Sequence, residues 1–203
     1  MRTWRRVSGR RVGRVIAVVA CCALLLASLA CSAGAAGEAG ASAQPTDPSG
    51  SYTVSGTNPD GSAYNGRLEV VRAGDTYTLT WMVGSNVSGI GVVRGNALAA
   101  AYPAESCLIA LYDISTGGGL EGSWATAQGT TVSPESAAPM QPNLAGAVAG
   151  RYTFSGTTAD GSPYQGEMEV SPDGVLYNVT QQSGTADLIG TGIVVGRQFA
   201  VSF

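Results

Sequence analysis

Hydrophobic and polar residues alternate with a period of two along most of the chain from Gly50 onward. Tyr52 and Val54 are flanked by polar residues, and Tyr77, Leu79 and Trp81 repeat the pattern. Such alternation predicts half-buried β-strands, and the glycine-rich turns between the runs predict hairpins between consecutive strands. No helical periodicity appears in this region. The pattern therefore predicts an all-β antiparallel meander that curls into a barrel or a sandwich to bury its apolar faces.

The beginning of this pattern occurs twice. Residues 50–70 recur as residues 150–170, with 13 of 21 positions identical at a constant offset of 100. The second copy ends at Phe203 and contains no counterpart of residues 107–124. The sequence therefore predicts two tandem repeats, at 50–132 and 149–203, of which the second is truncated.

Residues 133–148 contain three prolines and are predicted to form a linker between the two repeats. About five strands in the second repeat would leave unpaired edges, and open strand edges recruit other strands. The second repeat either joins the first in one larger structure or forms an open sheet that self-associates through its edge strands. We favour two distinct lobes packed together.

The N-terminal region has the pattern of an export signal. Six arginines within the first 14 residues precede an apolar stretch at 15–30, so residues 1–30 are predicted to be a signal peptide and residues 31–49 a flexible tether. Cys31 follows a sequence that resembles a bacterial lipobox, which predicts lipidation there. Cleavage at an Ala-x-Ala site within residues 33–43 is the alternative. Either way, we expect an exported protein: a periplasmic or outer-membrane-anchored lipoprotein, or a secreted protein.

Removal of the signal would leave a strongly acidic protein. All 14 acidic residues lie beyond position 31, against five of the 11 arginines, which gives a net charge of −9 for that part. An acidic surface repels phosphate backbones, so no nucleic-acid partner is expected. It also argues against a polybasic grip on anionic lipid, so membrane contact is expected only through the lipid anchor.

The residue inventory excludes most catalytic mechanisms. The chain has no histidine and no lysine, so Ser–His, Cys–His and Schiff-base chemistry have no base or amine. Glu69, Glu169 and Glu121 are the candidates for a carboxylate-based hydrolase, although acids on the solvent face of strands are commoner. Cys107 lies in an apolar run and is predicted to be a buried small hydrophobe. We predict a protein without enzymatic activity, cofactor or metal.

Two Asp-Gly pairs, at 60–61 and 160–161, could be mistaken for calcium loops. Calcium takes six to eight oxygen ligands, whereas each of these turns offers a single aspartate. Asp-Gly supplies the positive backbone φ of a tight turn. Both pairs are therefore interpreted as turns.

Aromatic residues at strand spacing have two interpretations. They either form the core of a small barrel, which we favour, or line a ligand pocket; in the second case Tyr52, Tyr77, Trp81 and Trp124 would surround an enclosed cavity. The full set of such residues is Tyr52, Tyr64, Tyr77, Trp81, Tyr112 and Trp124.

Four motifs carry a family resemblance. They are GTNPDGSAYNG at 56–66, TYTLTW at 76–81, GIGVVRGNAL at 89–98 and GLEGSW at 119–124. Together they resemble a group of exported bacterial β-proteins that are often labelled "fibronectin-binding protein". The resemblance covers residues 50–131 and again 150–203, and implies a β fold and an adhesive role. The second copy departs from it at Gln181, which replaces the tryptophan.

We therefore expect a non-enzymatic, envelope-associated binding protein of the adhesin type, which binds another protein. The first alternative is a lipocalin-like carrier of a small apolar ligand. The second is a carboxylate-based hydrolase, which requires two acids that converge in a cleft.

Overall fold

The computed structural model describes the chain from residue 47 onward, except residues 59, 103–106, 143–145 and 185. Before residue 47, it describes only the backbone of three short strands. Cys31 and residues 31–46 of the predicted tether lie outside the described residues, as does most of the predicted signal peptide. The export and lipidation hypotheses stay predictions.

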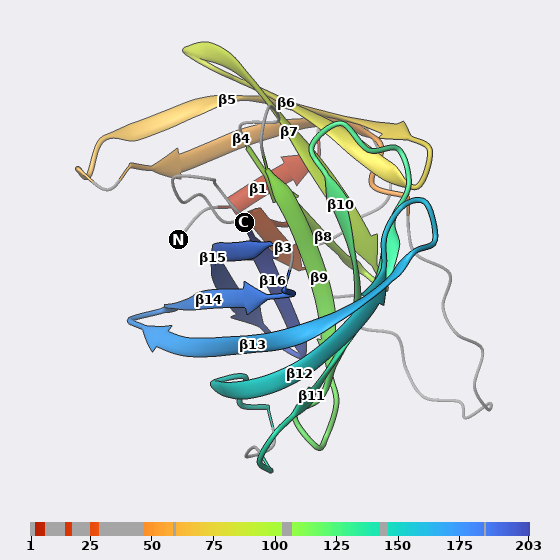
Figure 1. The fold of residues 1–203 in the computed structure, drawn as a ribbon. Helices are drawn as coiled ribbons and strands as arrows, with labels where there is room; N and C mark the ends of the chain where they lie inside the picture. Colours follow the sequence, from red (N-terminus) through yellow and green to blue (C-terminus); the bar gives the residue numbers. More distant parts are fainter. Residues whose placement is uncertain are drawn as a thin grey trace, which may run out of the picture.

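The C-terminal half of the chain forms a closed antiparallel barrel of eight strands (Figure 1). Its strands follow one another as a meander, and the last strand pairs with the first. They are β9 (Leu108–Ile114), β10 (Leu120–Thr126), β11 (Ser133–Pro139), β12 (Gly150–Thr157), β13 (Pro163–Asp173), β14 (Leu176–Gln182), β15 (Asp187–Val195) and β16 (Gln198–Ser202). Closure leaves no strand edge unpaired in this unit.

The preceding part of the chain forms a curled sheet of five strands. They are β4 (Gly50–Thr57), β5 (Ala63–Ala73), β6 (Thr76–Val83), β7 (Ser85–Arg94) and β8 (Ala97–Ala101). N-terminal strands extend both edges: β1 (Thr3–Arg6) pairs with β4, and β3 (Leu25–Ser28) pairs with β8 and with β2 (Val15–Ala17). The extended sheet does not close. The predicted all-β fold, an antiparallel meander with a barrel, is confirmed.

The two copies of the repeat have the same register. Tyr52 pairs with Leu68 in the sheet, and Tyr152 pairs with Met168 in the barrel. In both copies the same alternate positions point inward, because a strand's side chains alternate between its two faces. The inward-facing apolar residues of β4–β6, with Leu98 and Ala100 of β8, form one core on one face of the sheet. Those of the barrel form a second core inside it.

Two boundaries predicted from the sequence are wrong. Residues 133–139, predicted as linker, form β11, a central strand paired on both sides. Strands β9 and β10, assigned to the first repeat, complete the barrel of the second. The second copy is therefore not an open sheet: β12 is hydrogen-bonded to β11, and β16 to β9. The edges that suggested self-association of the second repeat are thus occupied.

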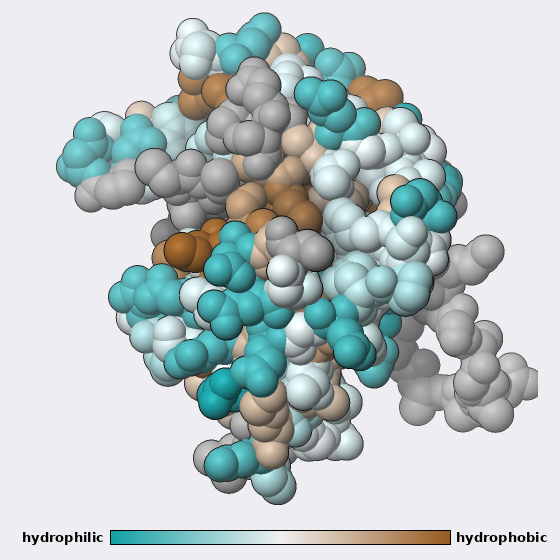
Figure 2. Space-filling model, in the orientation of Figure 1, coloured by the Kyte–Doolittle hydropathy of each residue, from teal (hydrophilic) through white to brown (hydrophobic). Residues whose placement is uncertain are grey.

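A third apolar cluster joins the two units. Ile90 and Val92 of β7 and Ala99 of β8 pack against Ile109 and Leu111 of β9. All five are buried. Figure 2 shows hydrophobic residues gathered at this junction, with hydrophilic residues over the strand ends. The two units pack against each other through this apolar interface.

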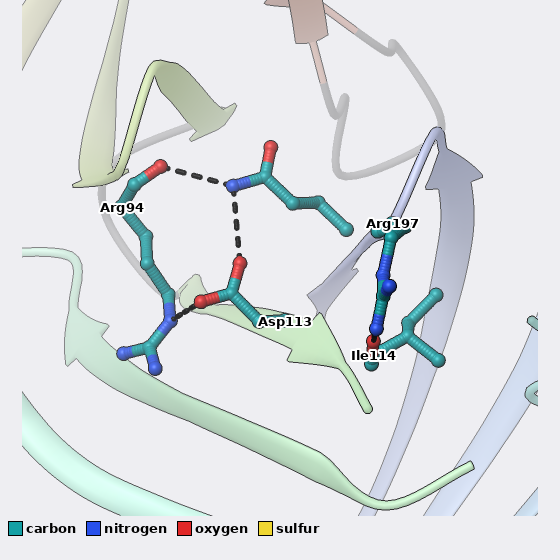
Figure 3. Close-up of polar contacts among 5 residues, drawn as sticks. Arg94, Asp113, Ile114 and Arg197 are labelled. Atoms are coloured by element: carbon teal, nitrogen blue, oxygen red, sulfur yellow. Dashed lines mark hydrogen bonds and ion pairs between the residues drawn. The ribbon is translucent and has the colours of Figure 1, made fainter. Parts of the chain in front are cut away.

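A polar clasp lies at the edge of the same junction. Arg94 Nε at the end of β7 donates to Asp113 Oδ2 of β9 at 2.5 Å, and both side chains are partly exposed. Gln198 of β16 donates from Nε2 to the Arg94 carbonyl at 3.0 Å. Arg197 NH2 donates to the Ile114 carbonyl at 2.9 Å within the barrel (Figure 3). These contacts join β7 to β9 and β16.

Cys107 is buried at the junction of the two lobes, as predicted. In the part of the chain that the structure describes, no helix is long and apolar enough to span a bilayer.

Candidate functional site

One carboxylate stands inside the barrel. Ser133, Glu135 and Ala137 are the buried positions of β11, and Pro134 between them faces outward. The period of two therefore directs Glu135 into the interior, where it is 5% exposed. An acid so deeply buried needs hydrogen-bond partners, since a bare charge costs several kcal/mol to desolvate.

Three donors from three strands meet the Glu135 carboxylate. Tyr112 of β9 donates its hydroxyl to Oε1, and Gln181 of β14 donates Nε2 to Oε1 at 2.9 Å. Tyr164 of β13 donates its hydroxyl to Oε2 at 2.6 Å. A carboxylate has about four lone-pair sites, so one remains on Oε2. The network is thus satisfied on the protein's side and still has room for one more donor.

Two glycines provide the space for the tyrosines. A Cβ at Gly156 would overlap the Tyr164 hydroxyl, and a Cβ at Gly122 would lie 2.5 Å from Tyr112 Cδ1. Only a residue without a side chain allows each ring to lie flat across the neighbouring strand. The first copy has the same arrangement, since Gly56 faces Tyr64 there.

Both hydroxyls stay protonated over the physiological range. Burial raises the pKa of Tyr112 well above its ordinary value, and the negative charge of Glu135 adds to the effect. Burial also raises the pKa of Tyr164, together with its hydrogen bond to Glu135. A tyrosinate beside a buried carboxylate would be doubly unfavourable. The two tyrosines therefore act as fixed donors.

A cavity of about 220 Å³ opens beside Glu135 at one end of the barrel. Its wall is mainly aromatic and aliphatic, from Tyr112, Trp124, Phe154, Tyr164 and Phe203 among others. The rings pack on one another: Trp124 meets Tyr164 edge-on at 6.3 Å between centroids, and Phe154 meets it at 6.0 Å. The cavity is smaller than the roughly 300–1,000 Å³ of pockets for drug-sized ligands.

One polar group in this wall is incompletely satisfied. The Trp124 Nε1–H is buried and hydrogen-bonded to no acceptor among the described residues, although it lies close to the Tyr164 hydroxyl. Buried indole N–H groups usually find an acceptor. This donor is therefore incompletely satisfied within the protein.

Among the described residues no basic side chain lines the cavity, and the chain contains neither lysine nor histidine. Among the arginines that the structure describes, Arg94 and Arg151 pair with Asp113 and Glu167, away from Glu135. The Glu135 carboxylate is thus hydrogen-bonded but has no positive partner in the cavity wall. A cation that entered the cavity would meet uncompensated negative charge.

A wider groove of about 660 Å³ adjoins the cavity over β10–β13. Glu135 and Tyr164 line both. The exposed Glu121 also lines the groove.

The structure divides the six aromatic residues selected from the sequence. Tyr112 and Trp124 line the cavity. Tyr52, Tyr77 and Trp81 are buried in the core of the five-stranded sheet, and Tyr64 is partly buried against them. The alternative arrangement, a pocket of Tyr52, Tyr77, Trp81 and Trp124, does not form among the described residues, because Trp124 belongs to the other lobe.

The three acids considered for a hydrolase do not converge in one cleft. Glu69 and Glu169 are exposed on equivalent strand positions in different lobes, and Glu121 is exposed at the groove. No metal-binding group of three or more acidic or cysteine side chains occurs in the described parts of the chain.

The Asp-Gly pairs form turns. Asp60 Oδ1 accepts from the Ser62 backbone N–H at 2.9 Å, and Gly61 has φ of 86°. Asp160 makes the same contact with Ser162 at 3.0 Å.

Comparison with known proteins adds no assignment to this site. No protein-family model, no curated protein and no solved structure matches the chain significantly.

Proposed function

We propose that the barrel is a non-enzymatic binding module whose ligand is a small organic amine. The observation that carries the proposal is Glu135: a buried carboxylate with one free lone-pair site and no basic side chain in the surrounding wall. An ammonium group can donate to that site and neutralise the charge. Charge-assisted hydrogen bonds of this kind are about twice as strong as neutral ones.

The aromatic wall supports the same ligand class. Trp124, Tyr164 and Phe154 surround the cavity next to the carboxylate, and aromatic faces attract ammonium groups by about 0.5–2 kcal/mol. Aromatic rings combined with a carboxylate are a recurring way to hold amines. The apolar part of the wall favours a ligand with a short hydrocarbon body.

The unpaired Trp124 Nε1–H adds a second polar requirement. A ligand with an acceptor oxygen a few bonds from its nitrogen would satisfy both Trp124 and Glu135. We therefore propose a compact amino alcohol or amino ether as the best fit. This refines the lipocalin-like carrier considered from the sequence, whose ligand was expected to be simply apolar.

The test is a titration of the purified protein with matched small molecules, followed by tryptophan fluorescence and by calorimetry. Pentylamine, pentanol and 3-methoxypropylamine share chain length and differ in one atom each. The proposal expects pentylamine to bind at least about tenfold more tightly than pentanol, and 3-methoxypropylamine more tightly still. Equal affinity for pentanol and pentylamine would reject an amine ligand.

Two variants locate the site. Glu135→Gln keeps the size of the side chain and removes its charge, so pentylamine affinity should fall at least about tenfold. Glu121→Gln removes an exposed charge from the adjoining groove and should change the affinity by less than about threefold. Equal losses in both variants would mean general electrostatic attraction to an acidic protein.

The setting of this activity is proposed from the N-terminal pattern: an exported protein of the envelope or the medium, without a nucleic-acid partner. An adhesin-like role for the whole chain stays a prediction based on the family resemblance.

A further inference from the structure

The thirteen strands β4–β16 contain two overlapping sets of eight. Strands β9–β16 form the closed barrel, a continuous meander. Strands β4–β11 are equally a continuous run of eight, in which β4–β8 have the sequence pattern and register of β12–β16. The two sets share β9–β11 (Leu108–Pro139).

We propose that β9–β11 is an exchangeable three-stranded unit, able to close a barrel on β4–β8 as well as on β12–β16. In the exchanged state β9 pairs with β8 and β11 pairs with β4, and β12–β16 are left as the open five-stranded sheet. This inference is independent of the proposed ligand, because it rests on the strands and not on the cavity.

A buried donor in the five-stranded sheet supports the exchange. Trp81 is 6% exposed, and its Nε1–H has no acceptor among the described residues. It stands where Gln181 stands in the barrel: Trp81 pairs with Leu68, and Gln181 with Met168. Gln181 Nε2 donates to Glu135 of β11. If β11 lay beside β4, Glu135 would supply the acceptor that Trp81 lacks.

The rest of the Glu135 network has counterparts in the first copy. Tyr64 occupies the position of Tyr164, opposite a glycine in both copies. Tyr112 is part of the exchangeable unit, because it lies on β9. All three donors to Glu135 thus have counterparts in the exchanged state.

Chain connectivity also allows it. Only residues 102–107 separate β8 from β9 along the chain, a length typical of the connection between antiparallel neighbours, and such neighbours commonly pair. During synthesis, β4–β11 are complete before β12 is made, so the exchanged barrel can form first. At two inward positions the observed barrel has the larger apolar residue, Phe154 for Val54 and Phe199 for Leu98, and burial of these rings favours the observed barrel. In the structure, β1 and β3 occupy the edges that β11 and β9 would take.

Disulfide trapping in the full-length chain tests the proposal, with all four native cysteines replaced by alanine. Ala138 faces Thr153 across β11 and β12, and both are exposed, so Ala138→Cys with Thr153→Cys reports the observed barrel. Ala138→Cys with Thr53→Cys reports the exchanged one, since Thr53 is the equivalent of Thr153. Ala138→Cys with Thr78→Cys reports random collision, because Thr78 lies on β6 and pairs with β11 in neither state.

Each protein is unfolded, refolded in an oxidising buffer and analysed for intramolecular disulfides by mass. The proposal expects the 53–138 disulfide to form at least about fivefold faster than the 78–138 disulfide. Equal rates, or 53–138 disulfides found only in dimers, would overturn it. The 153–138 protein shows that the substitutions permit folding.

A second variant tests the role of the tryptophan. Trp81→Phe removes the donor and keeps an aromatic ring, and should slow formation of the 53–138 disulfide by roughly tenfold, the value of one hydrogen bond to a charged acceptor. The 153–138 disulfide should be unaffected. An unchanged rate of 53–138 disulfide formation would show that Trp81 does not pair with Glu135 in the exchanged state.

Discussion

Tyr164 lies across from Gly156 in the register of β12 and β13, and its ring occupies the space that a side chain at position 156 would need. Its hydroxyl reaches Glu135 only because that space is empty. The small residue and the buried acid are therefore parts of one arrangement.

Gly156→Ala should displace Tyr164 from Glu135. Overpacking of this kind typically costs about 1–3 kcal/mol, so the free energy of unfolding in urea should fall by that amount. Amine binding should weaken in parallel. Gly117→Ala is the control, because no atom lies within 4 Å of a Cβ there and its φ is not positive. A stable Gly156→Ala protein would mean that Tyr164 can move without cost.

Tyr112→Phe should destabilise the barrel. It removes one donor to a charged acceptor, a contact worth about 1.5–3 kcal/mol. Urea denaturation of the variant measures the loss. Tyr177→Phe is the control: Tyr177 packs edge-on against Phe199 at 5.8 Å, and its hydroxyl has no hydrogen-bond partner among the described residues. Similar losses in both variants would argue against a special role for the carboxylate network.

Alkaline pH should unfold the barrel through its tyrosines. Tyr112 and Tyr164 have raised pKa values in the folded state because burial disfavours their ionised form. Below pH 10, the ordinary value, both states are protonated and stability is constant. Above it, only the unfolded chain loses these protons, so the free energy of unfolding falls by about 1.4 kcal/mol per pH unit for each tyrosine.

Chemical denaturation at a series of pH values above 10 measures this slope. Tyr112→Phe should make it shallower by the contribution of one proton. A slope that is the same in the variant would show that Tyr112 ionises in the folded protein.

The junction between the lobes should depend on its apolar cluster. Ile109 is fully buried there, and Ile109→Ala should lower the free energy of unfolding by about 2–5 kcal/mol. Asp113→Asn removes the ion pair with Arg94. The Arg94 side chain is 33% exposed and that of Asp113 is 51% exposed, so the loss should cost less than about 1 kcal/mol. A larger loss in Asp113→Asn than in Ile109→Ala would mean that the polar clasp, and not the apolar cluster, holds the lobes together.

The sequence predicted the strands well where alternation was strong. Tyr52 and Val54, or Leu68 and Val70, are buried at every second position, as the pattern indicated. The paired registers of the two copies also follow from the offset of 100. Local alternation and turn chemistry were sufficient to predict these strands and the hairpins that join them.

The site could not be predicted in the same way. Glu135 lies in a segment with two flanking prolines, which argued for a linker, and its inward position is polar where a core residue was expected. The only signal was the alternation of Ser133, Glu135 and Ala137 with Pro134. That β9–β11 would complete the second copy depends on pairing between β9 and β16, which is remote in sequence and has no local signature.

The first and last residues of the barrel are hydrogen-bonded to each other. The Leu108 N–H donates to the Phe203 carbonyl at 3.1 Å, and the Phe203 N–H donates to the Leu108 carbonyl at 3.0 Å. A domain whose first and last residues are hydrogen-bonded neighbours can be re-opened at any of its turns and joined at its old ends without changing one strand pair. Circular permutation at the turn between β13 and β14, at Gly174, should therefore preserve the fold, and the same geometry makes residues 108–203 a natural unit to insert into other chains.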